Sequence, residues 1–239
     1  MAVKETAVPE KAGRDDKPTF STALNNFLRK NRVVFITLLV VVLVAILVAA
    51  IWTLVDSRIS SSSAKGLEKV EESMQAWGAM AEGPESQSKA DEILAELDAL
   101  ALKYGKRYVS QKALFLSGQI YAERSDWANA EKKYTQAADL NTDSSVAFFA
   151  LQEAAVAAEE QQHNEAAIAL WKRVVESKSG STIGMPHAYF ALGTLYEESK
   201  QYSEASASYD KLVSEYPDND WTKLARDRII LLKARGLLP

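Results

Sequence analysis

The sequence has no cysteine among its 239 residues, and it has only 10 glycines and 6 prolines. The absence of cysteine excludes a disulfide scaffold, a cysteine nucleophile, a thiolate metal site and a lipidated N-terminal cysteine. The shortage of glycine and proline argues against an all-β fold, which needs a turn after every strand. Alanine, the residue with the highest helix propensity, occurs 36 times instead. The composition therefore predicts an all-α protein.

Charge is missing from one long stretch, residues 33–55, in which nearly every side chain is apolar. A helix of this length extends about 34 Å, enough to cross a hydrocarbon core of about 30 Å. The stretch is longer than the apolar part of a signal peptide and follows 32 residues rather than a short basic leader. It predicts a transmembrane helix over residues 33–55, with Trp52 near one interface.

The charges on either side of this stretch predict its orientation. Arg29, Lys30 and Arg32 precede it, whereas only Arg58 and Lys65 fall within ten residues after it. The excess of positive charge indicates a cytoplasmic N-terminus and export of the rest of the chain. The net charge is +3 up to Arg32 and −7 from Asp56 onward.

The shorter segments around the span differ in composition. Residues 1–18 are polar and are expected to be disordered. Residues 19–32 carry apolar side chains at helical spacing and end in basic residues, which predicts an amphipathic juxtamembrane helix or a simple stop-transfer flank. Residues 56–63 are mostly serine and are expected to form a linker before a domain over residues 64–239.

Two stretches of this domain repeat the same pattern of small and aromatic residues. In each, a glycine is followed by tyrosine after three residues, alanine after twelve and tyrosine after sixteen. The two sets are Gly118, Tyr121, Ala130 and Tyr134, and Gly193, Tyr196, Ala205 and Tyr209. The glycines allow a second helix to approach closely, and the alanines provide a small surface opposite them.

This pattern resembles the 34-residue tetratricopeptide repeat (TPR), with frames at about 111–144 and 186–219. A degenerate third repeat lies between them at about 148–181, with Ala155 in the place of glycine. A weaker fourth unit precedes them, with helices at 64–80 and 88–104. A last helix, 221–235, is expected to cover the array with Leu224, Ile229, Ile230 and Leu232. The resemblance implies an α-solenoid of three to four helical hairpins with a C-terminal capping helix.

Catalytic and metal-binding patterns are absent from the sequence. Neither of the two histidines, His163 and His187, has a histidine or carboxylate three or four residues after it that would form a metal-binding pair on its own helix face, so both are interpreted as surface or packing residues. No phosphate-binding loop or nucleophile elbow occurs. The acidic domain has no basic stripe, which argues against nucleic-acid binding. We expect neither an enzyme nor a cofactor.

The TPR resemblance implies a binding groove lined by the first helix of each hairpin. The positions expected to face it are Lys112, Phe115, Gln119, Glu123, Phe149, Gln152, Val156, Glu159, Glu160, His187, Phe190, Thr194, Glu197 and Glu198. The phenylalanines would form an aromatic strip and the glutamates an acidic rim, suited to a segment with apolar anchors and basic residues. The alternative is that the phenylalanines are buried and the glutamates only aid solubility.

The expected function is that of a membrane-anchored adaptor in the bacterial inner membrane, with its repeat domain in the periplasm and proteins as partners. The short cytoplasmic segment, single span and exported repeat domain resemble the bacterial family of ancillary Sec translocon subunits, which implies a role at the export channel. The alternative function is a structural scaffold within a motility, secretion or cell-division assembly. The sequence leaves the partner and the oligomeric state open.

Overall fold

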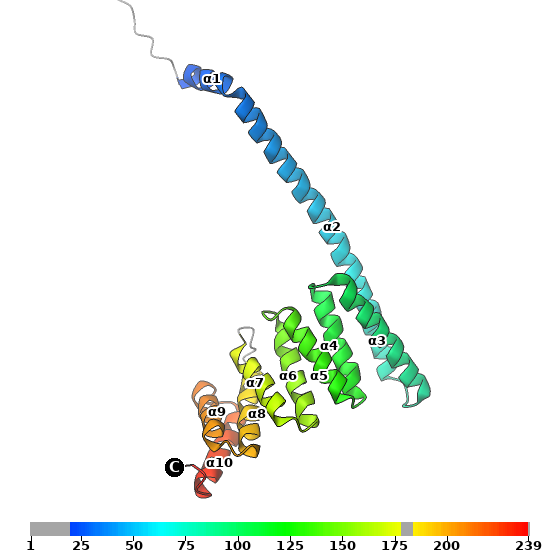
Figure 1. Cartoon of the computed structure of the whole chain (residues 1–239), viewed down its shortest axis with the longest axis vertical. Helices are drawn as coiled ribbons and strands as arrows, with labels where there is room; N and C mark the ends of the chain where they lie inside the picture. The colour runs from blue at the N-terminus through cyan, green and yellow to red at the C-terminus, as the bar shows by residue number, and fades with distance from the viewer. Residues whose placement is uncertain (1–19, 178–183, 239) are drawn as a thin grey trace, which may run out of the picture. The chain divides into compact units, whose positions relative to one another are not determined.

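A computed structural model describes residues 20–177 and 184–238, and within these ranges it contains helices and no strands. The tail expected over residues 1–18 lies outside the described residues. The helices are shown in Figure 1, and their bounds are α1 Phe20–Lys30, α2 Arg32–Gly78, α3 Pro84–Tyr104, α4 Tyr108–Glu123, α5 Trp127–Leu140, α6 Ser145–Glu160, α7 Asn164–Glu176, α8 Met185–Glu198, α9 Tyr202–Glu215 and α10 Asp220–Ala234.

The chain divides into two compact units, Met1–Ile59 and Ser60–Pro239. The first contains α1, in the place of the expected juxtamembrane helix, and the apolar part of α2. Arg29 and Lys30 lie in the last turn of α1. Every residue from 33 to 55 in α2 is exposed, so no other described part of the protein covers this apolar surface. By length and composition α2 is a candidate membrane span, although a signal sequence meets the same criteria.

The sequence predicted a linker over residues 56–63, but the helix is not interrupted there. These residues are part of α2. The segment has no glycine or proline to interrupt the helix. Its serines instead bond to the carbonyls of the preceding turn: Ser57 Oγ donates to Leu54 O at 2.9 Å, and Ser63 Oγ to Ser60 O at 2.8 Å. The boundary between the two units nevertheless falls inside the predicted segment.

The second unit is a series of antiparallel helical hairpins, which confirms the all-α repeat fold. Its hairpins pair α4 with α5, α6 with α7, and α8 with α9. In each hairpin a residue with positive φ lies two positions after the end of the first helix: Ser125, Gln162 and Lys200. The next backbone N–H then donates to a carbonyl five residues earlier in all three hairpins. This shared turn fixes the register and places Ala155 where the other repeats have glycine.

The glycine and aromatic positions of the pattern are in direct contact. A methyl group added to Gly118 would lie 2.5 Å from Tyr134 Cδ1, and one added to Gly193 would lie 2.7 Å from Tyr209 Cδ1. Both tyrosines are buried, and in the degenerate repeat the equivalent aromatic is the buried Trp171. The second helix therefore approaches closely at these glycines, as the sequence predicts, but the nearest atoms belong to the tyrosine ring and not to the alanine expected opposite.

Helix α10 packs against α8 and α9 and closes the array. Leu232 is buried and Ile229 packs against the core, as predicted. Leu224 and Ile230 are exposed, so the prediction that they cover the last repeat is wrong. Thr222 and Ala225 are buried in α10 instead, because its inner face is turned away from the two larger side chains.

Candidate functional site

The first helices of the three repeats, α4, α6 and α8, share one accessible stripe. Each helix buries about half of its residues, but four positions spaced three or four residues apart are half-buried or exposed in every repeat. Because this spacing keeps side chains on one side of a helix, the positions form four rows across the array. The rows are Lys112, Phe149 and His187; Phe115, Gln152 and Phe190; Gln119, Val156 and Thr194; and Glu123, Glu160 and Glu198.

The expected aromatic strip is not a single row. Phe115 packs against Tyr134 with ring centroids 5.4 Å apart, and Phe190 packs against Tyr209 at 5.8 Å, so both rings are half-buried. Phe149 lies in the neighbouring row and is 48% exposed. A phenylalanine side chain that is about half exposed in the middle repeat is a candidate contact for an apolar side chain of a partner.

Two polar side chains of the two central rows, Gln152 and Thr194, donate hydrogen bonds to backbone carbonyls within the protein. Gln152 takes the place of phenylalanine in the middle repeat, and its Nε2 donates to Gly184 O at 3.3 Å. The Thr194 hydroxyl donates to Ala191 O at 2.8 Å. Gln119 and Val156 are half-buried beside them. These two rows therefore form an uncharged floor along the middle of the stripe, with both apolar and polar side chains.

The acidic row consists of Glu123, Glu160 and Glu198, all of which are exposed. Glu159 and Glu197, which the sequence also assigned to the groove, lie one position away and turn toward the second helix of their hairpin. The Trp171 Nε1–H donates to Glu159 at 2.5 Å, and the Tyr209 hydroxyl donates to Glu197 at 2.7 Å. These two carboxylates hold hairpins together, so only the other three glutamates form the rim.

Glu197 is also paired with a cation from the capping helix. Arg228 Nε donates to its carboxylate at 2.9 Å, and the Glu197 side chain is only 8% exposed. Burial raises the pKa of the Tyr209 hydroxyl that shares this carboxylate. At Glu159, burial raises the pKa and the Trp171 hydrogen bond opposes that rise. The sequence alone does not show which glutamate of each adjacent pair is bound within its hairpin and which is exposed.

His187 lies between two tryptophan rings at one end of the stripe. Its ring centroid is 5.2 Å from that of Trp171 in α7 and 4.7 Å from that of Trp221 in α10. Burial lowers the pKa of its imidazole. The prediction that His187 is a packing residue fits this arrangement.

We expect His187 to make the repeat domain less stable in mild acid. The imidazole of a histidine in an unfolded chain has a pKa of about 6.5. The pKa of His187 in the folded protein is lower. Between these two pKa values the unfolded state therefore binds more protons than the folded state. Stability is full above the unfolded pKa and falls as the pH drops toward the folded pKa. Urea unfolding of the full chain in detergent, at about pH 8 and about pH 5, should show a smaller acid loss for His187→Gln than for the unchanged chain. The same loss in both proteins would contradict this, and His163→Gln serves as the exposed control.

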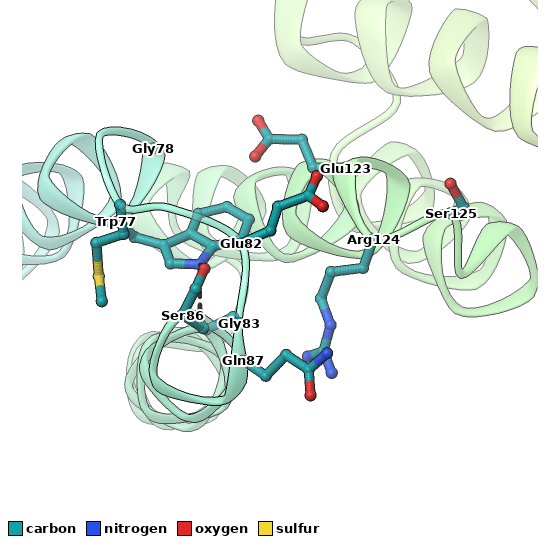
Figure 2. A pocket seen from close by; sticks show the side chains of 11 residues that line it. Trp77, Gly78, Glu82, Gly83, Ser86, Gln87, Glu123, Arg124 and Ser125 are labelled. Atoms are coloured by element: carbon teal, nitrogen blue, oxygen red, sulfur yellow. Dashed lines mark hydrogen bonds between the residues drawn. The ribbon is translucent and has the colours of Figure 1, made fainter.

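A polar hollow of about 630 Å³, which Glu123 of the acidic row helps to line, lies beside the turn between α2 and α3 (Figure 2). Trp77 lines it and donates its Nε1–H to Ser86 Oγ at 2.9 Å. Arg124, which also borders it, pairs with Asp91 at 2.6 Å. The sequence did not indicate this hollow, because residues such as Glu82 and Arg124 lie at helix ends and outside the repeat pattern.

Metal chemistry has no obvious place in the part of the chain that the structure describes. Over residues 20–177 and 184–238, no three histidine or carboxylate side chains form a group that could hold a metal ion. The arrangement offers surface recognition: an apolar ring, a neutral floor and an acidic rim. These features define the class of protein as an α-solenoid of helical hairpins with an accessible stripe on its first helices.

Comparison with known families agrees with this class. A tetratricopeptide repeat-like domain family matches residues 25–181, and a tetratricopeptide repeat family matches residues 186–219. The chain belongs to the tetratricopeptide repeat-like domain family. The first match includes the apolar run of α2, and the second coincides with the last repeat frame predicted from the sequence.

Individual proteins show the same relationship. A TPR repeat-containing protein of Treponema pallidum (strain Nichols) is 28% identical over 157 residues, which is 64% of this chain and 64% of that protein. The chain thus matches less than two thirds of that relative's length. A tetratricopeptide repeat protein from Parabacteroides merdae has a TM-score of 0.53 at 19% identity, covering 72% of this chain and 61% of that one. TPR-like repeats of a putative kinesin light chain from Podosopora anserina give 0.50 at 12% identity, covering 74% and 87%. At these identities, the solved structures establish the fold alone.

Proposed function

We propose that this protein is a membrane-anchored binding module that holds a polypeptide segment along the stripe of α4, α6 and α8. The observation that carries the proposal is the continuity of the stripe. All twelve of its positions are half-buried or exposed in three successive repeats. A surface that runs unbroken across several repeats suits an elongated ligand rather than a small molecule.

The two edges of the stripe differ in chemistry, and this difference indicates what kind of ligand would fit it. The row that contains the exposed ring of Phe149 lies near the helix starts, and the acidic row of Glu123, Glu160 and Glu198 lies at the helix ends. A partner that places an apolar side chain against Phe149 would bring its neighbouring residues to the acidic row. We therefore propose a segment that combines apolar anchors with lysine or arginine. We assign no catalytic activity to the domain.

The proposed location is the bacterial inner membrane, with the N-terminus in the cytoplasm and the repeats outside it. The uncharged run of residues 33–55 and the basic residues before it support this placement. A binding module so placed is suited to proteins that emerge from an export channel, as in the ancillary translocon subunits that the chain resembles. A scaffold role in an envelope assembly would require fixed neighbours along the array.

The groove is tested by crosslinking in intact membranes. A photoreactive residue at Phe149 or Glu160 should capture partner chains at least about tenfold more often than one at Lys132, an exposed position on α5. The difference is expected because a photoreactive group captures only chains that lie against it, and the residues that contribute most to binding cluster near the centre of an interface. Partners found in fixed ratio at Lys132 but not at the stripe would contradict the binding module and favour the scaffold.

A companion substitution measures the contribution of one ring. Phe149→Ala should weaken partner capture about 30-fold, the equivalent of a loss of about 2 kcal/mol. The fold should be largely unaffected, because nearly half of the side chain is already in solvent. Thr142→Ala, an exposed change in the loop before α6, is the control and should leave capture unchanged. Undiminished capture by Phe149→Ala would remove Phe149 from the binding surface.

A further inference from the structure

The turn between α3 and α4 differs in charge from the rest of its domain. Between Asp98 and Glu123 the sequence has four Lys/Arg and no Asp/Glu, whereas the chain from Asp56 onward has a net charge of −7. Three of the four basic residues, Lys103, Lys106 and Arg107, lie within five residues at the turn. Lys103 and Lys106 are exposed. An acidic domain therefore carries a local basic patch at one connection.

Large apolar side chains stand exposed on both sides of the same turn. Leu102, in the last turn of α3, is 86% exposed, and Tyr108, the first residue of α4, is 63% exposed. Gly105 between them has a φ of 59°, which lets the chain reverse within three residues. Single exposed apolar residues are common on proteins. Leucine and tyrosine flanking lysines in one tight turn form the combination found at membrane interfaces.

A hydrogen bond ties this turn to the part of α2 that follows the proposed span. The Tyr104 hydroxyl lies 3.2 Å from Ser62 Oγ. Ser62 is seven residues after Val55, a separation of at most about 25 Å in extended chain and about 10 Å in helix. The headgroup layer itself adds several ångströms to the hydrocarbon core. The tether therefore keeps the turn within reach of the bilayer surface.

We propose that the α3–α4 turn, residues 102–108, docks on anionic lipid headgroups through Lys103 and Lys106, with Leu102 and Tyr108 inserted between them. The proposal depends on the membrane span proposed above. Docking would hold the α3–α4 turn at the membrane surface, at the start of α4, where Tyr108 lies one helical turn before Lys112 of the stripe. Each basic residue near an anionic surface contributes about a fivefold preference for the docked state.

Two carboxylates near the turn determine which of its basic residues can attract anionic lipid. Glu68 and Glu71 of α2 line a hollow of about 420 Å³ that Arg107 and Tyr108 also border. Their negative charge offsets that of Arg107. Lys103 and Lys106 are not part of that hollow, so these two lysines supply the attraction to lipid.

The test uses the full chain in vesicles and exploits its lack of cysteine. Leu102→Cys takes a single fluorescent label, and Ser203→Cys in α9 carries the same label at an exposed position of the last repeat. The vesicles contain lipids with a headgroup quencher, in phosphatidylcholine alone or with a minority of phosphatidylglycerol. We expect the Leu102 label to be quenched strongly with phosphatidylglycerol and weakly without it, and the Ser203 label to be quenched weakly in both.

Charge reversal then separates attraction to lipid from mere proximity. Lys103→Glu with Lys106→Glu should lower the ratio of docked to undocked protein by more than about tenfold. The pair Lys132→Glu and Lys200→Glu changes the net charge equally at exposed sites elsewhere and should have little effect. Equal quenching of both labels, or no effect of reversing Lys103 and Lys106, would overturn the docking proposal, as would dependence of the quenching on an added acidic peptide rather than on lipid. Failure of the full chain to enter the vesicles would instead overturn the span.

Discussion

Trp171→Ala is expected to reduce the free energy of unfolding of the repeat domain by about 3–5 kcal/mol. The side chain is 0% exposed and lies in the core at the centre of the array. Removing it leaves a cavity, withdraws one ring from His187, and leaves Glu159 without its 2.5 Å indole donor. Both the lost packing and the lost hydrogen-bond donor act in the same direction.

Urea unfolding of the full chain in detergent, followed by circular dichroism, measures this effect. Phe149→Ala is the matched aromatic control and should cost less than about 1 kcal/mol, because its ring is nearly half exposed. Trp171→Phe should fall between the two, since it keeps most of the volume but donates no hydrogen bond. If Trp171→Ala were as stable as Phe149→Ala, the packing described for the middle repeat would be incorrect.

Gly193→Val is expected to be the most damaging of the small changes, at about 3 kcal/mol. A Cβ atom at this position would lie 2.7 Å from both Cδ1 and Cζ of the Tyr209 ring. The ring cannot easily move away, because it is buried and its hydroxyl is held at 2.7 Å by Glu197. The helices of the last hairpin would have to separate, and valine offers more bulk than they can accept.

Two comparisons make this prediction specific. Gly193→Ala should cost less, because alanine's higher helix propensity offsets about 1 kcal/mol of the strain. Gly78→Val, at the end of α2, is the control, because a Cβ there would have no atom within 4 Å. The same urea experiment should rank the three changes with Gly193→Val as the least stable. A Gly193→Val protein as stable as Gly78→Val would show that glycine is not required at this contact.

In the middle repeat, the sequence predicted the positions of the packing residues but not the orientation of the adjacent glutamates. Ala155 takes the position of Gly118 and Gly193, and the residue sixteen positions later is again a buried aromatic, Trp171. Such offsets are local, so they can be read from one chain. The orientation of Glu159 and Glu160 could not be predicted in the same way. Adjacent residues on a helix point about 100° apart, and small uncertainty in the helix phase exchanges their roles.

The serine-rich segment before the domain shows a different limit. Its polarity suggested a linker, but polarity alone does not end a helix when each hydroxyl can bond to a carbonyl of the preceding turn. The capping helix shows a third limit. Its apolar residues were identified, yet Leu224 and Ile230 face solvent, while Thr222 and Ala225 pack inward.

By itself, the sequence determined the all-α hairpin array, its repeat register and the uncharged run of residues 33–55. These depend on helix propensity, on spacing along one chain and on the absence of charge, and none of them requires a distant contact. Only the tertiary structure decided which stripe residues are accessible and which are occupied. Glu197 is bound by Tyr209 and Arg228, which are 12 and 31 residues away in the sequence, and His187 is enclosed by rings from α7 and α10. Those partners come from other helices, so their identity depends on how the helices pack.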